Sequence, residues 1–201
     1  MGVAPVRLGD ARPCGPAEPL SAAGPGVCER LRQCVVVSLT FRLLMSIELV
    51  REAIDRIRAA ADGAWFVGER SEELVSSAEE ALGFSLPEGY RLFVRELGAG
   101  NVGAAEVFGV ATADFFDSAV PNGVWLTLDV REAWGLPESM LVVHFYGGVD
   151  YYVMDCELDN PPLLLWRPGV SSVDDELAVV AEDFGSFLLE LTERELSETE
   201  G

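Results

Sequence analysis

Residues 140–156 constrain the fold more than any other part of the chain, because they predict a β-hairpin. The two halves, MLVVHFY and VDYYVMDC, are rich in β-branched and aromatic residues and flank Gly147-Gly148. Two glycines between such runs are typical of a two-residue hairpin turn of primed type. Both faces of this hairpin are largely apolar, so we expect the sheet to be covered on at least one side.

Counting outward from a two-residue turn predicts the register of the hairpin. One face carries the pairs Tyr146 with Val149, His144 with Tyr151, and Val142 with Val153. The other face carries the pairs Phe145 with Asp150, Val143 with Tyr152, and Leu141 with Met154. The adjacent Tyr151 and Tyr152 therefore point to opposite faces, and we expect at least one of them to be partly exposed.

Apolar residues at steps of three and four predict helices around this hairpin. The expected helices begin at Ser46, Ser71, the capping box Ser85–Glu88, Asn122 and a second capping box, Ser172–Asp175. Shorter apolar runs predict strands at residues 64–67, 104–111 and 163–167. Strands in sequential hairpins with flanking helices indicate a single α+β domain with a mainly antiparallel sheet.

The composition changes near Met45. Residues 1–44 hold five Arg and three acidic residues, whereas the remainder holds nine Arg and 31 acidic residues, a net charge of −22. We expect residues 1–45 to be a disordered extension, or the product of an incorrectly assigned start with Met45 as the true first residue. The folded domain is expected at 46–192, followed by an acidic, fraying tail at 193–201.

The cysteines and the apolar runs indicate a cytoplasmic protein. Cys14, Cys28 and Cys34 lie in the early segment, and their spacings match no zinc pattern. We expect reduced thiols, as in the cytosol. The apolar run at 35–44 starts too late for a signal peptide, and no stretch reaches 18 apolar residues, so no membrane span is expected.

The charge balance excludes one class of partner and favours another. The chain has no Lys, 14 Arg and 34 acidic residues, for a net charge of −20. Binding of nucleic acid through its phosphates needs clustered Lys and Arg, so we expect no nucleic-acid partner. An acidic surface suits a basic protein partner or simply maintains solubility.

Three sequence features could indicate a catalytic, cofactor or metal site, and each favours a structural interpretation. Gly98, Gly100 and Gly103 form a literal G-x-G-x-x-G, but a helix precedes it and a strand follows, the reverse of a dinucleotide site. His144 is the only histidine and lies mid-strand, where a hydrogen-bonded face or core histidine is expected. The acidic residues lack the spacing of a calcium loop. We therefore expect no cofactor and no metal.

Several motifs in order resemble the SUKH superfamily, in its Smi/Knr-like branch. They are Leu82–Tyr90 followed by Phe93, the Gly98–Asn101 turn leading to Glu106–Val110, Gly135–Pro137, Asp155, Trp166 and Phe184–Leu188. The likeness covers residues 46–192. It implies an α+β fold without known catalysis, in which the signature residues are structural: Leu82, Gly83, Leu86, Pro87, Tyr90, Gly98, Gly100, Gly109 and Trp166.

The resemblance also implies a function, because many bacterial members are immunity proteins that bind and block a cognate toxin, often a nuclease. A nuclease needs a basic cleft, which an acidic domain complements. The first hypothesis is therefore a non-enzymatic immunity protein. The second is a cytosolic regulatory scaffold, and the third is an enzyme or small-ligand binder built around His144. The predicted partner-binding residues are acidic and aromatic: Asp114, Asp117, Asp150, Tyr151, Tyr152, Asp155, Glu157 and Asp159.

Overall fold

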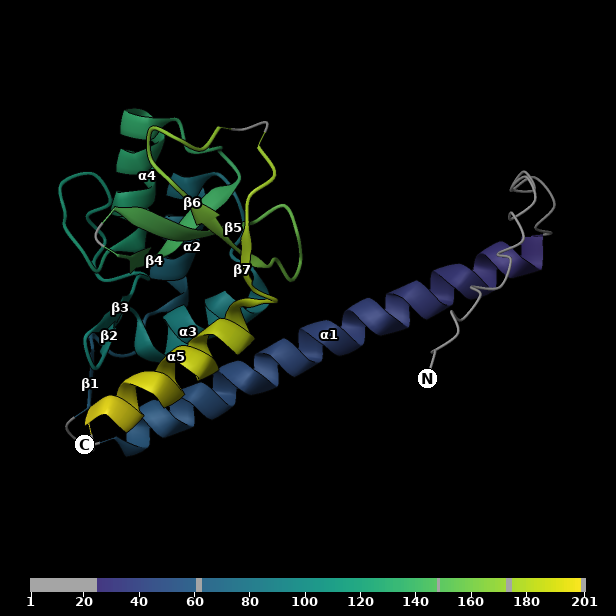
Figure 1. Cartoon of the computed structure of the whole chain (residues 1–201), viewed down its shortest axis with the longest axis horizontal. Coiled ribbons are helices and arrows are strands. Elements are labelled where there is room, and N and C mark those ends of the chain that lie inside the picture. The colour runs from purple at the N-terminus through teal and green to yellow at the C-terminus, as the bar shows by residue number, and fades with distance from the viewer. Residues whose placement is uncertain (1–24, 61–62, 148, 173–174, 200–201) are drawn as a thin grey trace, which may run out of the picture. The chain divides into compact units, whose positions relative to one another are not determined.

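The structure is a computed structural model that describes residues 25–60, 63–147, 149–172 and 175–199 (Figure 1). The chain divides into two units, residues 1–38 and residues 39–201. In the first unit, the described residues 25–38 are helical.

Helix α1 (Pro25–Ala59) begins in the first unit and supplies residues 39–59 to the second. The predicted cap at Ser46 is wrong: Ser46 lies buried inside the helix, because neither Pro nor Gly interrupts residues 27–60. The predicted apolar face is confirmed, since Ile47, Val50, Ile54 and Ile57 are buried. Residues 25–45 of the expected extension are thus helical, whereas residues 1–24 lie outside the described residues.

In the described part of the chain, seven strands form one sheet whose spatial order follows the sequence. All six neighbouring pairs are antiparallel. The strands are β1 (Ala64–Phe66), β2 (Gly100–Val102), β3 (Ala105–Val107), β4 (Met140–Tyr146), β5 (Asp150–Asp155), β6 (Leu163–Trp166) and β7 (Val179–Ala181). The predicted α+β fold with a mainly antiparallel sheet is confirmed.

Helices cover both faces of the sheet (Figure 1). The remaining helices are α2 (Glu72–Leu82), α3 (Glu88–Leu97), α4 (Gly123–Trp134) and α5 (Phe184–Thr199). Helix α4 packs on one face through an apolar cluster: Phe108, Leu126, Val130, Leu136, Val142, Val153 and Trp166. Helices α3 and α5 cover the other face, where the Phe93 ring lies 5.4 Å from that of Phe184. Both faces of the hairpin are therefore largely buried.

A β-bulge changes the predicted register of the hairpin. Leu141 pairs with Met154 and Val142 with Val153, as predicted, but the register then shifts, and His144 pairs with Tyr152 instead of Tyr151. Val143 is the extra residue. The bulge places His144 on the face opposite Val142, and Tyr146 pairs with Asp150, so the connection has three residues and not two.

The predicted cap of α2 is confirmed, and the predicted capping box of α3 is wrong. The hydroxyl of Ser71 accepts the Leu74 N–H and Gly83 ends α2 in the left-handed conformation, as predicted. The box Ser85–Glu88 does not form, because Pro87 holds the preceding backbone extended, and α3 starts at Glu88. The Leu86 N–H is instead accepted by the Glu79 carboxylate at 2.9 Å.

The C-terminal region differs most from expectation. Residues 179–181, predicted to begin a helix after Ser172–Asp175, form β7, because β6 offers an unpaired edge. Helix α5 begins at Phe184, and the Asp183 carboxylate accepts the Ser186 N–H. The helix runs through the predicted tail to Thr199, since Leu196 packs on the core.

Candidate partner-binding site

The nine signature residues of the resemblance, named in the sequence analysis, hold the fold together. All of them are buried except Gly83, which ends α2. The Tyr90 hydroxyl donates a hydrogen bond of 3.0 Å to the Phe108 carbonyl, and burial raises the pKa of Tyr90, so this hydroxyl keeps its proton. Gly98 follows the end of α3, Gly100 begins β2 and Gly103 lies in the turn between β2 and β3, in the predicted order of helix before strand. These positions supply structure and offer no reactive group at the surface.

His144 has the surroundings of a packed histidine. Its ring lies 5.3 Å from the Tyr152 ring and 5.4 Å from the Phe187 ring, measured between centroids. Its Nδ1 is 2.6 Å from the Glu106 carbonyl oxygen. Because a carbonyl oxygen can only accept, Nδ1 carries the proton and donates this hydrogen bond. Burial lowers the pKa of His144, so the neutral ring prevails near pH 7. This environment suits a structural role.

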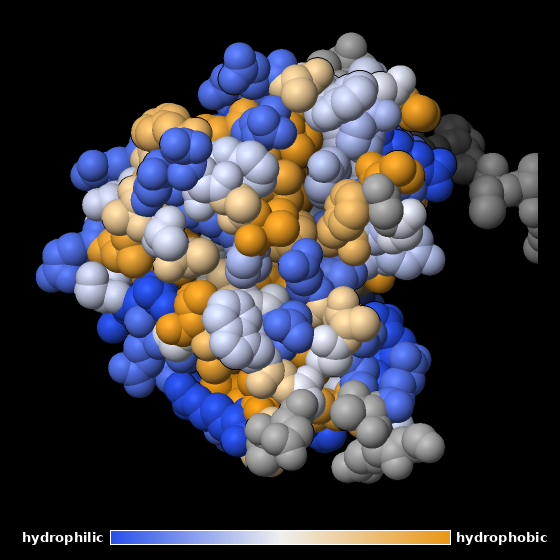
Figure 2. Space-filling model, turned by 90° about the vertical axis from the view of Figure 1, so that its left-hand side faces the viewer, coloured by the Kyte–Doolittle hydropathy of each residue, from blue (hydrophilic) through white to orange (hydrophobic). Residues whose placement is uncertain are grey.

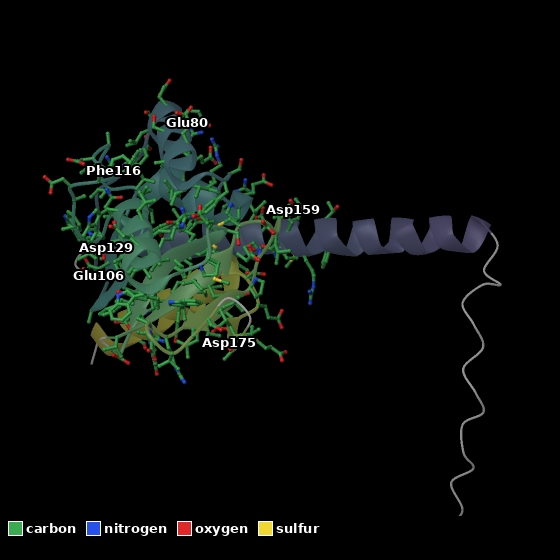
Figure 3. The ribbon with its side chains drawn as sticks, turned by 90° about the horizontal axis from the view of Figure 1, so that it is seen from above. Glu80, Glu106, Phe116, Asp129, Asp159 and Asp175 are labelled. Carbon is green, nitrogen blue, oxygen red and sulfur yellow. The ribbon has the colours of Figure 1, made fainter. Side chains whose placement is uncertain are left out.

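The predicted contact residues do not form one surface. Tyr152 lies beside Phe187 on the α5 face of the sheet, whereas Tyr151 pairs with Phe145 on the α4 face. Asp150 and Asp155 are at opposite ends of β5. In Figure 3, Asp159 lies on the side of the domain opposite Phe116 and Asp129. Glu157 and Asp159 are thus separated from the loop that carries Asp114 and Asp117.

That loop, residues 111–121, has a defined internal structure. The Asp114 carboxylate accepts the N–H groups of Phe116 and Asp117. The buried Asn122 amide donates to the Asp114 carbonyl at 3.1 Å and anchors the loop at the start of α4. Phe116 is left 79% exposed at its tip. Asp114 therefore supports the loop through its carboxylate, and Asp117 and Phe116 face solvent.

A groove on the α4 side joins two of the predicted residues to others that the sequence did not single out. We call it the hairpin groove; it has a volume of about 410 Å³ and is lined by Trp134, Phe145, Val149, Asp150, Tyr151, Arg167, Pro168 and Val170. Trp134 is 53% exposed and Val170 is 75% exposed. The space-filling view of the left-hand side of Figure 1 shows apolar patches between hydrophilic ones (Figure 2).

The residues missed by sequence reasoning come from three separate segments. The indole of Trp134 lies at the end of α4, Phe145 and Val149 at the hairpin tip, and Val170 beyond β6. Trp134 continues the helical stripe of Thr127 and Val130, which are both buried, so periodicity alone places it in the core. Its position in the last helical turn, next to Gly135, is the feature that separates it from the core.

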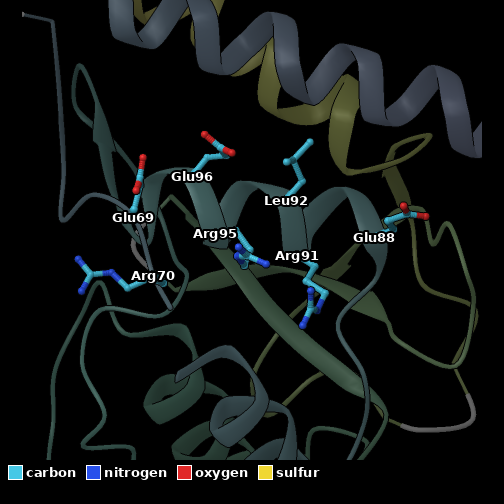
Figure 4. Close-up of a pocket in the computed structure, with 7 residues that line it drawn as sticks. All are labelled: Glu69, Arg70, Glu88, Arg91, Leu92, Arg95 and Glu96. Carbon is cyan, nitrogen blue, oxygen red and sulfur yellow. The ribbon is translucent and has the colours of Figure 1, made fainter. Parts of the chain in front are cut away.

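A second pocket lies between α3 and the segment before α2, with a volume of about 420 Å³ (Figure 4). Its lining is charged: Glu69, Arg70, Glu88, Arg91, Leu92, Arg95 and Glu96. Arg91 and Arg95 both form ion pairs with Glu72 of α2, and Arg91 also contacts Glu79 at 3.3 Å. Because Arg91 and Arg95 already have carboxylate partners and Arg70 donates to the backbone carbonyls of Val67 and Gly68, this pocket is a link between two helices.

The Glu72 pairs predict a pH dependence of stability. Hydrogen bonding to Arg91 lowers the pKa of Glu72 in the folded protein. Its stabilising contribution is therefore complete above the unfolded pKa of about 4.3 and is lost as the pH falls through the folded value. The difference in unfolding free energy between wild type and Glu72→Gln should shrink as acid is added, in urea titrations from about pH 7 to about pH 3. Glu80→Gln, an exposed change on the same helix, controls for the loss of one negative charge; a Glu72 difference that stays constant with pH would contradict the assignment.

Among the described residues, no group of three or more His, Cys, Asp or Glu is arranged to hold a metal ion. Within the same residues, no helix combines the length and the apolar character that crossing a membrane requires.

The SUKH_5 family model, described as SMI1-KNR4 cell-wall, matches residues 50–193. No curated protein matches the chain. The matched range begins within α1 and ends within α5, so it includes the whole sheet and the hairpin groove.

Proposed function

Since the chain belongs to the SUKH family of SMI1-KNR4 proteins over most of its length, we propose that it is a non-enzymatic immunity protein. It neutralises a cognate toxin domain in the cytoplasm by covering the toxin's basic cleft. The partner is a protein, of the nuclease type, and the complex forms without a cofactor. The surroundings of His144 make it a packing residue, and this supports a binding role for the protein over a catalytic one.

The charge of the domain is the observation that carries this proposal. Residues 45–201 have a net charge of −22. A nuclease must hold phosphates with a concentrated positive field, and a strongly acidic protein is drawn to such a field and is repelled by most other cellular surfaces. Most of the acidic side chains on the helices are exposed, including Glu48, Glu52 and Glu80, and so contribute to the long-range field.

Co-expression with the toxin domain encoded beside this gene tests the proposal. We expect the full chain to restore growth of cells that produce the toxin and to bind it one to one. The association rate should fall by about tenfold or more between about 50 mM and about 500 mM NaCl, because salt screens the electrostatic attraction that speeds the encounter of the two proteins. No rescue by the chain, or binding that is indifferent to salt, contradicts the proposal. A His144→Ala variant that lost all protection while remaining folded would point instead to chemistry at that residue.

A further inference from the structure

The hairpin groove has the composition of a protein-binding surface on an otherwise charged molecule. Three aromatic rings line it, from Trp134, Phe145 and Tyr151, and the last two lie 5.3 Å apart between centroids. The Trp134 ring also lies against the backbone at Gly169, 3.5 Å from the position a Cβ would take there. Large aromatic side chains held by their surroundings and partly open to solvent are typical of interface hot spots.

The groove also carries an incompletely neutralised negative charge. The side chain of Asp150 is 23% exposed, and its only ion pair among the described residues joins its Oδ2 to the Nε of Arg167 at 3.5 Å. That distance exceeds an ordinary charge-assisted hydrogen bond of about 2.8 Å, so the pair is loose. A second carboxylate, Asp129, is close enough for its charge to raise the pKa of Tyr151, after burial, which has the larger effect. Asp150 is therefore the carboxylate that lines the groove, with a loose partner in Arg167, and Asp129 adds negative charge near Tyr151.

We propose that the hairpin groove receives an arginine side chain of the partner protein, whose guanidinium lies against Trp134 and pairs with Asp150. Arginine fits better than lysine, because a planar guanidinium both stacks on an aromatic ring and binds a carboxylate through two N–H groups. In the free protein, Arg167 occupies the same carboxylate loosely and is displaced or joined by the incoming side chain. The inference rests on the proposed function, since a basic partner supplies the arginine.

A peptide titration tests the groove without knowledge of the toxin. The probes are acetyl-Leu-Arg-Leu-amide and acetyl-Leu-Glu-Leu-amide, added to the ¹⁵N-labelled full chain. The indole N–H signals of the tryptophans are assigned with single Trp→Phe variants. We expect the arginine peptide to shift the Trp134 signal saturably, with a Kd on the order of 1 mM, and to leave Trp65 unchanged. Trp65 is a matched reference, being 58% exposed against 53% for Trp134. No saturable shift, an equal shift with the glutamate peptide, or an equal shift at Trp65 would overturn the inference.

Two arginine variants separate local pairing from bulk charge. Arg167→Ala should lower the Kd of the arginine peptide about threefold, because it frees Asp150. Asp150→Asn should raise that Kd by about the same factor. Arg51→Ala makes the same charge change at a side chain of matching exposure, 58% against 56%, paired with Glu48 on α1. It should change the affinity by less than about 1.5-fold at physiological salt. If Arg167→Ala and Arg51→Ala changed the peptide affinity equally, the net charge of the protein alone would explain the effect. The proposed arginine site in the hairpin groove would then be refuted.

The toxin itself distinguishes the two proposals. If the toxin binds the full chain and Trp134→Ala weakens it about tenfold while Trp65→Ala does not, both proposals hold. If the toxin binds but Trp134→Ala and Asp150→Asn leave the Kd unchanged, the groove assignment fails and the immunity function stands. If no neighbouring toxin binds but the peptide is taken up as expected, the immunity function fails and the groove remains an arginine site.

Discussion

Replacement of Trp166 by alanine is expected to lower the free energy of unfolding by about 3–5 kcal/mol. Trp166 ends β6 and is fully buried. It belongs to the cluster under α4 with Val142 and Val153 of the two central strands. Removing the indole leaves a cavity in the middle of a small domain, and the strands around it cannot close the space without breaking the sheet register.

Urea denaturation followed by circular dichroism measures this loss, and two variants serve as controls. Trp65→Ala removes an equally large side chain that is 58% exposed, and should cost less than about 1 kcal/mol. Trp166→Phe should cost less than Trp166→Ala, since the buried Nε1 of Trp166 finds no hydrogen-bond partner among the described residues and phenylalanine removes that unpaired group. A Trp166→Ala protein as stable as Trp65→Ala would show that α4 does not depend on this cluster.

The sequence predicted the elements whose determinants are local. The Ser71 cap and the Gly83 terminus of α2 depend only on residues within that helix, and both are confirmed. The strands β4 and β5 were predicted for the same reason. The bulge at Val143 was not predicted, because it lets His144 face α5 while Val142 faces α4, and this demand comes from packing on two sides of the sheet. Strand β7 was missed because its pairing depends on the edge of β6, outside its own sequence.

The candidate site was predicted only in part, for a related reason. Asp150 and Tyr151 were named from the hairpin, and the structure places both in the hairpin groove. Tyr152 was named with them but faces α5, since neighbouring residues of a strand alternate. Trp134 and Val170 are 36 positions apart in the sequence and meet only because α4 and the β6–β7 connection converge beside the hairpin. Periodicity within one element contains no information about that convergence.

Replacement of Gly109 by alanine is expected to cost about 3 kcal/mol or more of folding free energy, through overlap and not through lost burial. A Cβ at Gly109 would overlap the carbonyl oxygen of Gly98 and lie 3.3 Å from the Phe93 ring. The Gly109 carbonyl accepts the Gly123 N–H at 2.7 Å, and its own N–H donates to Pro121 at 3.2 Å. Backbone on both sides therefore fixes the position of Gly109, and the strain has no flexible side chain to absorb it.

A second glycine provides a control with the opposite sign. A Cβ at Gly89 would meet Ser46 and Val50 at 3.6 Å, an ordinary contact, and Gly89 lies within α3. Alanine is favoured over glycine in a helix, so Gly89→Ala should stabilise the protein by about 0.5 kcal/mol. Thermal and urea unfolding of the two variants should therefore move in opposite directions. The contrary result would be a Gly109→Ala protein that unfolds at the same urea concentration as wild type. The backbone at the end of α3 would then shift without cost to make room for the Cβ. The close approach of Gly109 to Gly98 would not be what places α4 against the sheet.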